Sequence, residues 1–149
     1  MPCTMSTVLL VDDDLESLWS FQLALESKGH RVVLADSARN ALRKLAHEPA
    51  NVIITDLEMP EIDGAELCRR VRCWPAFTQV PIVLMSAAPE PTVGPRCWSM
   101  YFRKPADLSS LMRAVESFVA ERLTMASTTL ACSGPAASRW QPVDHRCWP

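Results

Sequence analysis

The sequence predicts an α/β fold in which a parallel sheet of five strands carries helices on both faces. Between residues 7 and 104, short apolar runs alternate with segments of helical period, an order typical of strand–helix–strand units. Three of the apolar runs are continuous and contain no alternating polar residues, as expected for strands that helices cover on both sides. With 48% hydrophobic and 21% charged residues, the 149-residue chain has the composition of a globular domain.

The apolar runs define the predicted strands. In chain order they are residues 8–11, 32–35, 52–54, 81–85 and a weaker run at 100–102. A helical segment separates most neighbouring runs, so the strands should lie parallel to one another.

The first two predicted helices follow the first two strands. Apolar residues recur every three or four positions from Leu15 to Leu25, and Gly29 is a plausible helix stop. Ser37 stands where an N-cap is needed, and the apolar stripe that follows it ends before Pro49.

The third predicted helix opens at Gly64, and the last helix, over residues 108–119, has the clearest period in the chain. Pro89, Pro91 and Pro95 interrupt the segment between the last two strands. A regular fourth helix should therefore be absent or cut to about one turn, which would leave an irregular and mobile loop.

The domain is predicted to span residues 5–123. From residue 124 to residue 149 the composition shifts to Ser, Thr, Ala, Pro and Gly without a sustained apolar period, which is typical of a flexible C-terminal tail. Trp140 and Trp148 in this tail could dock on the domain or on a partner, or simply be exposed.

Charge and hydropathy exclude several classes of function. A net charge of −2 gives no field that would hold nucleic acid or an anionic membrane. No apolar run is long enough to span a bilayer, and the amino terminus lacks a basic segment followed by an apolar one. The chain is therefore predicted to be cytoplasmic. Its six cysteines form no zinc or disulfide pattern, so free thiols are expected.

Polar residues that follow four of the five predicted strands form the candidate site. They are Asp12, Asp13, Asp14, Asp56, Ser86 and Lys104. In a doubly wound sheet, ligands bind at the carboxyl ends of the strands. Each residue alone has an ordinary explanation as a solvated turn, a helix cap or a surface lysine. Together, however, clustered carboxylates repel one another unless a cation lies among them, and Mg²⁺ fits such oxygen ligands best.

Four motifs give the chain a family resemblance. They are Val-Asp-Asp-Asp at 11–14, Thr-Asp-Leu-Glu-Met-Pro-Glu-Ile-Asp-Gly at 55–64, Met-Ser-Ala-Ala at 85–88 and Tyr-Phe-Arg-Lys-Pro at 101–105. With these four motifs in this order, the chain resembles the receiver domain of two-component response regulators. The resemblance is to the single-domain type found in chemotaxis regulators. The resemblance covers about the first four fifths of the chain. It implies a flavodoxin-like doubly wound sheet with strand order 2-1-3-4-5.

The resemblance also implies the chemistry of the site. Asp56 would be the phosphoacceptor nucleophile, and Asp12 and Asp13 would hold Mg²⁺ together with Asp56. The backbone carbonyl of Glu58 would complete the protein ligands. Positioning and electrostatics would then supply most of the catalysis.

Further residues take roles from the same resemblance. Lys104 would pair with a phosphoryl oxygen, and the peptide bond between it and Pro105 is typically cis in this family. Ser86 would donate a hydrogen bond to the phosphoryl group, and its movement with Tyr101 would be the switch. In the loop after the third strand, Pro60 would rigidify the chain and Gly64 would permit its turn into the third helix.

The predicted function is that of a phosphoacceptor response regulator that a histidine kinase or histidine phosphotransfer protein phosphorylates, and that signals to a downstream protein. It would be no enzyme beyond its own phosphoryl transfer and autodephosphorylation. One alternative is a phosphorylation-independent interaction module with the same fold. Another is an aspartyl-phosphate phosphatase, but that class needs a second aspartate where Glu58 stands. The tail is too short for a helix-turn-helix output domain, and the choice among partner binding, phosphorelay intermediate and phosphate sink stays open.

Overall fold

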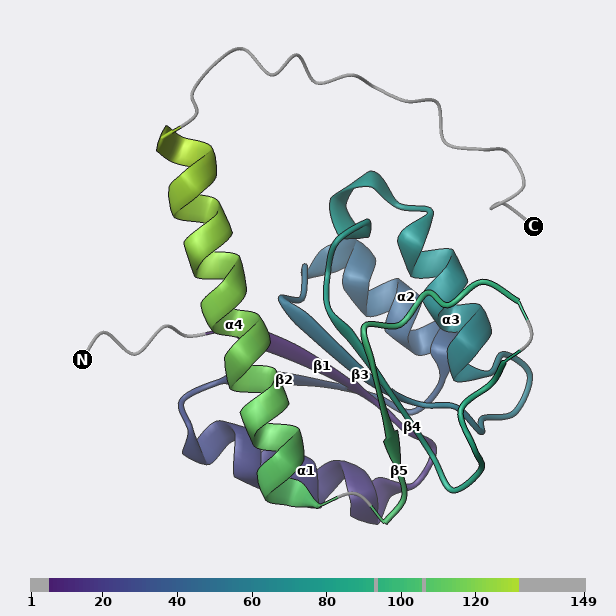
Figure 1. Cartoon of the computed structure of the whole chain (residues 1–149). Coiled ribbons are helices and arrows are strands. Elements are labelled where there is room, and N and C mark those ends of the chain that lie inside the picture. The colour runs from purple at the N-terminus through teal and green to yellow at the C-terminus, as the bar shows by residue number, and fades with distance from the viewer. Residues whose placement is uncertain (1–5, 93, 106, 132–149) are drawn as a thin grey trace.

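Five parallel strands form one sheet in the computed structural model, which describes residues 6–92, 94–105 and 107–131 (Figure 1). The strands are β1 (Thr7–Val11), β2 (Arg31–Ala35), β3 (Val52–Asp56), β4 (Ile82–Ser86) and β5 (Met100–Arg103). Their order is β2-β1-β3-β4-β5, and every neighbouring pair is parallel. The predicted flavodoxin-like strand order is therefore confirmed.

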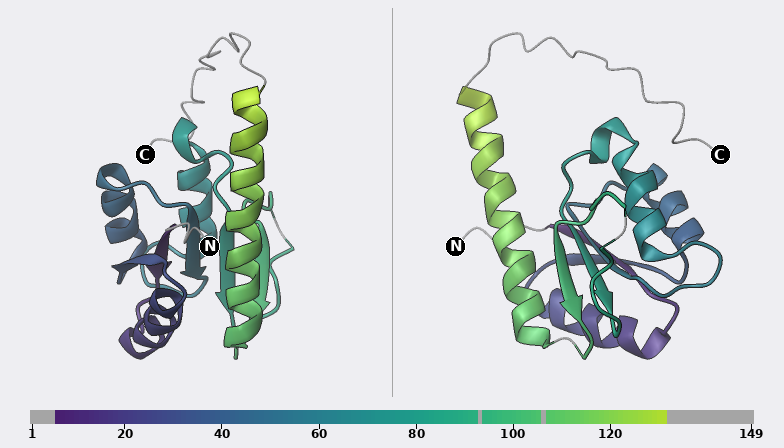
Figure 2. Two further views of the ribbon diagram at one scale, coloured as in Figure 1. Left: turned by 90° about the vertical axis from the view of Figure 1, so that its left-hand side faces the viewer. Right: turned by 45° about the vertical axis from the view of Figure 1, so that its right-hand side comes forward.

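Helices cover both faces of this sheet (Figure 2). The α-helices of the described chain are α1 (Leu15–Ser27), α2 (Ala38–His47), α3 (Gly64–Arg72) and α4 (Leu108–Ala131), with a 3-10 turn, η1, at Pro75–Phe77. One buried cluster joins the sheet to α2 and α3, and a second joins it to α1 and α4. Every residue of β3 and β4 is buried, which explains why their sequences are apolar without alternation.

Side chains cap three of the helices where the sequence places polar residues. Asp14 accepts a hydrogen bond from the backbone N–H of Glu16 at the start of α1. Ser37 does the same for α2, as predicted. Asp63 caps α3, whose first residue is the predicted Gly64. These caps satisfy backbone donors that a helix leaves unpaired at its first turn.

The connection between β4 and β5 contains no helix in its described residues, 87–92 and 94–99, so the predicted loss of the fourth helix is confirmed. Side chains hold this segment in place. The Trp98 indole is 6% exposed and donates to Glu90 Oε1 over 2.8 Å. The guanidinium of Arg72 donates to the backbone carbonyls of Cys97 and Val80. The mobility of the loop stays a prediction, although the hydrogen bonds of Trp98 and Arg72 hold parts of the segment.

The last helix differs from the sequence-based boundary. It continues to Ala131, whereas the apolar period predicts a helix over residues 108–119 and the predicted tail begins at residue 124. Residues 124–131 contain neither Gly nor Pro, so nothing stops a helix that is already nucleated. Figure 1 shows the end of α4 extending beyond the sheet. The rest of the predicted tail, with its tryptophans, lies outside the described residues.

The described cysteines have different states. Cys68 lies fully buried in the core between the sheet and α3, where burial raises the pKa of its thiol to about 12, so it behaves as a small apolar group. Cys97 is also free, but Cys73 is disulfide-bonded. The expectation of free thiols is therefore wrong at Cys73.

None of the helices in the described residues combines the length and the apolar content that crossing a bilayer requires.

His30 introduces a pH dependence into the folded domain. The residue is 8% exposed, and neither ring nitrogen has a hydrogen-bond partner within the described chain. Burial lowers its pKa, although the charge of Glu116 on α4 opposes this effect. The folded state then binds fewer protons than the unfolded chain does. The free energy of unfolding should therefore fall as the pH drops below about 6.5, by at most about 1.4 kcal/mol per pH unit.

Urea denaturation between about pH 7.5 and pH 5 tests this effect in the wild type, His30→Gln and His47→Gln. His30→Gln should flatten the pH dependence, because its amide does not titrate. His47 is exposed and serves as the matched control, so His47→Gln should keep the slope of the wild type. Equal slopes in all three proteins would contradict the role of His30.

Candidate functional site

The carboxyl ends of β1, β3, β4 and β5 meet at one edge of the sheet. Asp12 directly follows β1, Asp56 and Ser86 are the last residues of β3 and β4, and Lys104 directly follows β5. The strands are parallel neighbours, so their ends lie together. The backbone N–H of Lys104 donates to the carbonyl of Ser86 over 2.8 Å, which fixes the end of β5 against β4.

Three carboxylates and one ammonium group gather at this edge. Oxygen atoms of Asp12, Asp13 and Asp56, here called the carboxylate cluster, lie within 4.8 Å of one another. Lys104 Nζ lies 3.5 Å from Asp12 Oδ2 and 3.4 Å from Asp56 Oδ1. The Lys104–Pro105 peptide bond is cis, as the resemblance implied. The structure thus brings together Asp12, Asp13, Asp56 and Lys104, whereas Asp14, which the sequence also singled out, caps α1 and lies outside the cluster.

Burial dominates the electrostatics of the cluster. Asp12 is 2% exposed and Asp56 is 5% exposed, and this burial raises the pKa of both carboxyl groups although Lys104 opposes the rise. Burial alone would lower the pKa of Lys104, but the two carboxylates outweigh it and raise that pKa. One ammonium group therefore faces two buried carboxylates and does not balance their charge.

The donor set fits a divalent cation. Asp12 Oδ2 and Asp56 Oδ1 are buried and accept no hydrogen bond from the described residues. Asp13 belongs to the same cluster but is exposed, so the cluster is open to solvent on that side. Mg²⁺ prefers such hard oxygen ligands and retains several waters. The chemistry of these oxygen ligands therefore fits a magnesium ion.

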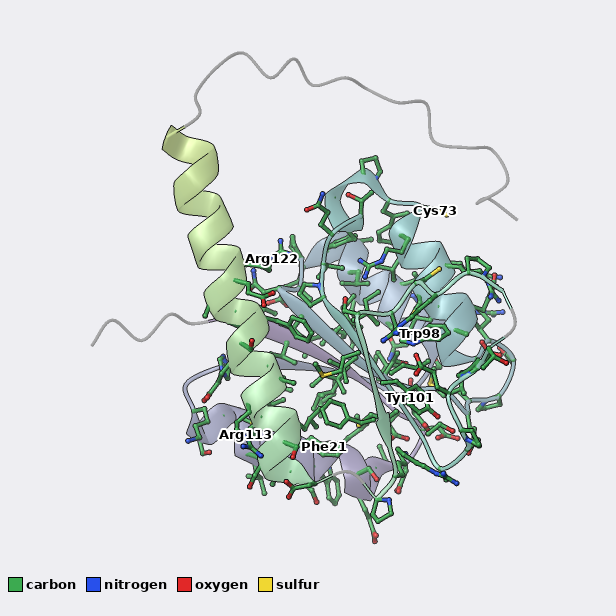
Figure 3. All side chains as sticks on the ribbon, in the orientation of Figure 1. Phe21, Cys73, Trp98, Tyr101, Arg113 and Arg122 are labelled. Atoms are coloured by element: carbon green, nitrogen blue, oxygen red, sulfur yellow. The ribbon has the colours of Figure 1, made fainter. Side chains whose placement is uncertain are left out.

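A second set of contacts lies beside the cluster. Ser86 is completely buried, and its Oγ donates to Glu58 Oε1 over 3.2 Å and accepts from the backbone N–H of Ala88 over 3.0 Å. The Tyr101 hydroxyl donates to the carbonyl of Ala88. Tyr101 packs against the core cluster on the α3 side of the sheet, as does Trp98 (Figure 3). Both predicted switch residues, Ser86 and Tyr101, therefore contact Ala88.

Sequence reasoning missed part of this set. It assigned Glu58 a role only through its backbone carbonyl, and it gave Ala88 none. The hydrogen bond from Ser86 to Glu58 joins residues 28 positions apart, and no motif or period in the sequence signals it.

The loop between β3 and α3 is closely packed against the candidate acceptor. A Cβ atom on Gly64 would lie 2.3 Å from the backbone oxygen of Asp56, so the chain can pass there only without a side chain. The N–H of Gly64 donates to the carbonyl of Leu57 over 2.9 Å. Pro60 is exposed in this loop, and Glu61 has a left-handed backbone with φ of 69°. The predicted structural role of Gly64 has a direct physical basis in this contact.

Comparisons with known proteins agree with the fold. A family model described as the response regulator receiver domain matches residues 8–116. The chain is 37% identical to the transcriptional regulatory protein AfsQ1 of Streptomyces coelicolor over 83 residues, which are 56% of this chain and 36% of that protein. It is 37% identical to the two-component response regulator ORR3 of Oryza sativa over 91 residues, 60% of this chain and 70% of that protein. The chain thus spans about a third of AfsQ1.

Solved structures give the same result. The chemotaxis response regulator CheY4 of Vibrio cholerae superimposes with a TM-score of 0.70 at 27% identity, over 77% of this chain and 99% of that one. The crystal structure of a putative response regulator from Chloroflexus aurantiacus gives a TM-score of 0.70 at 29% identity over 78% of this chain and 99% of that one. With a family model that matches most of its length, this chain belongs to the response regulator receiver domain family.

Proposed function

We propose that this chain is a phosphoacceptor response regulator in which Asp56 accepts a phosphoryl group from a histidine kinase or a histidine phosphotransfer protein. The observation that carries the proposal is the buried pair of Asp12 and Asp56 that shares one ammonium group, Lys104, beside the exposed Asp13. This arrangement can attract a cation and a phosphoryl group to the same place. The signal would pass onward through protein–protein contacts.

In the proposed transfer, a carboxylate oxygen of Asp56 attacks the phosphorus atom of a phosphohistidine. The new P–O bond forms as the P–N bond breaks, and the electron pair of the P–N bond leaves with the imidazole. Lys104, whose raised pKa keeps it protonated at neutral pH, pairs with a phosphoryl oxygen. Ser86 donates a hydrogen bond to another. Mg²⁺, held by Asp12, Asp13, Asp56 and the carbonyl of Glu58, would supply the remaining positive charge.

The surface of α1 supports a protein as the phosphodonor. Leu15, Trp19 and Leu23 are 55%, 58% and 71% exposed, and their spacing of four residues places them on one face of the helix. α1 begins next to the carboxylate cluster, at Leu15. An exposed apolar row of this kind typically marks a protein interaction site. Its position would let a partner contact α1 while presenting a histidine to Asp56.

Incubation with an acyl phosphate donor, followed by intact mass spectrometry, tests the proposal. The protein should gain one phosphoryl group when Mg²⁺ is present and none when a chelator removes the ion. The bond should be labile to hydroxylamine, as an acyl phosphate is and a phosphoserine is not. Failure to take up phosphoryl from any small donor or phosphohistidine protein would overturn the proposed function.

Removal of the exposed carboxylate should weaken Mg²⁺ binding. Asp13→Ala takes a charge and a ligand out of the carboxylate cluster, and we expect the affinity for Mg²⁺ to fall roughly tenfold or more. Calorimetric titration with Mg²⁺ measures the change. Asp14→Ala is the matched control, because Asp14 caps α1 and lies outside the cluster. It should cost some stability but change Mg²⁺ affinity less than twofold; equal losses in the two variants would refute the assignment of Asp13.

A further inference from the structure

The hydroxyl group of Ser86 is engaged on two sides in this structure. It donates to Glu58 Oε1 over 3.2 Å and accepts from the backbone N–H of Ala88 over 3.0 Å. A serine hydroxyl has a single hydrogen to donate. Ser86 is also completely buried, so it has no access to bulk water. The hydroxyl must release Glu58 before it can donate to any other acceptor.

We propose that Glu58 is a positioning residue whose carboxylate holds Ser86 and thereby opposes the phosphorylated conformation. The inference rests on the function proposed above, in which Ser86 donates to a phosphoryl group on Asp56. Asp56 pairs with Met85, the neighbour of Ser86, across β3 and β4. A phosphoryl oxygen on Asp56 and the carboxylate of Glu58 thus compete for one hydrogen atom.

The location of Glu58 suits this role. The residue lies two positions after Asp56 in the loop that leaves β3, and it is exposed. Once Ser86 turns away, the carboxylate can be hydrated at little cost, so the restraint is reversible. Its negative charge also repels a phosphoryl group nearby. Competition for the hydrogen and charge repulsion therefore act in the same direction, and an experiment has to separate them.

Ala88 provides a local reporter of the restraint. Its N–H donates to Ser86, and its carbonyl accepts from the Tyr101 hydroxyl. A change in the position of Ser86 alters the first of these bonds and so the environment of the Ala88 amide. The amide signal of Ala88 in a nuclear magnetic resonance spectrum should report whether Ser86 is held by Glu58 or released.

The central measurement is the affinity for beryllofluoride, a phosphoryl mimic, in the presence of Mg²⁺. Glu58→Ala keeps the backbone carbonyl but removes the competing acceptor, and it should bind the mimic roughly three- to tenfold more tightly than the wild type. Glu61→Ala is the matched control. Glu61 lies in the same loop and is exposed, and its carboxylate pairs with Arg39 at 3.6 Å without contacting Ser86. Its loss should change the affinity by no more than about twofold.

Substitution of Ser86 separates the two effects. In a Ser86→Ala background only charge repulsion remains, so adding Glu58→Ala should improve binding by clearly less than it does in the wild type. In a Ser86→Thr background the hydroxyl is retained, and the full effect of Glu58→Ala should return. In the free protein, Glu58→Ala should also shift the Ala88 amide signal toward its mimic-bound position, a test that does not depend on the folding of Ser86→Ala.

Two results would overturn the proposal for Glu58 while leaving the proposed function intact. In the first, the wild type binds the mimic, but Glu58→Ala improves binding by the same factor in the wild-type and Ser86→Ala backgrounds. In the second, the Ala88 amide signal of the free protein does not shift when Glu58 is replaced by Ala. A wild type that neither binds the mimic nor accepts a phosphoryl group would instead overturn the proposed function, and the role of Glu58 would fall with it.

Discussion

Asp56→Asn is expected to abolish acyl-phosphate formation and to leave the domain folded. The amide has the shape of the carboxylate but cannot act as the nucleophile. It should also make the Mg²⁺-free protein more stable at neutral pH. Burial raises the pKa of Asp56 despite the attraction of Lys104, so the folded state binds more protons than the unfolded chain. A charged Asp56 therefore costs stability as the pH rises past its ordinary pKa, and a neutral amide at this position avoids that cost.

Intact mass after incubation with an acyl phosphate donor and Mg²⁺ decides the first part, and urea denaturation decides the second. Asp63→Asn is the matched control, because Asp63 caps α3 and lies outside the carboxylate cluster, and asparagine also caps helices well. This control should accept a phosphoryl group at the level of the wild type. Full phosphorylation of Asp56→Asn would place the nucleophile on another residue.

The fold was predictable because its signals are local. Each strand is a short apolar run, and the burial of β3 and β4 on both faces explains why their runs lack alternation. The edge that holds the site follows from the topology, since the carboxyl ends of neighbouring parallel strands must lie together. Asp12 and Lys104 are far apart in sequence and still lie 3.5 Å apart at their charged atoms. The apolar runs locate the strand ends, and the strand order implied by the family resemblance identifies which of these ends are neighbours.

Features that depend on distant side chains or on weak local preferences were not predictable. The bond from Ser86 to Glu58 and the bonds from Arg72 to Cys97 and Val80 join separate elements, and the residue types involved have many other possible partners. The end of α4 was misplaced because the loss of an apolar period was interpreted as the end of the helix. A helix continues through polar residues when no Gly or Pro stops it.

Gly64→Ala is expected to destabilise the domain by about 3 kcal/mol or more, since overpacking alone typically costs about 1–3 kcal/mol and here the obstacle includes backbone. The added Cβ atom would lie 2.3 Å from the backbone oxygen of Asp56 and 2.7 Å from Leu84 Cδ1. The Leu84 side chain can shift, but Asp56 ends the central strand β3 and is held by its neighbours. The loop that carries Gly64 must therefore move away from Asp56, and its displacement would strain the end of β3 and disturb the alignment of Asp56 with Lys104.

Urea denaturation and the rate of phosphorylation by an acyl phosphate donor test this prediction together, with Gly29→Ala as the control. Gly29 has φ of 87° and open space around its Cα, so alanine there pays only for a left-handed backbone, roughly 1–2 kcal/mol, and the site is untouched. Gly64→Ala should lose more stability than Gly29→Ala and should also slow phosphorylation under conditions where both variants are folded. A Gly64→Ala protein that matched Gly29→Ala in stability and the wild type in rate would show that the loop can move away from Asp56 freely, and the close approach at Gly64 would then have no role in positioning the acceptor.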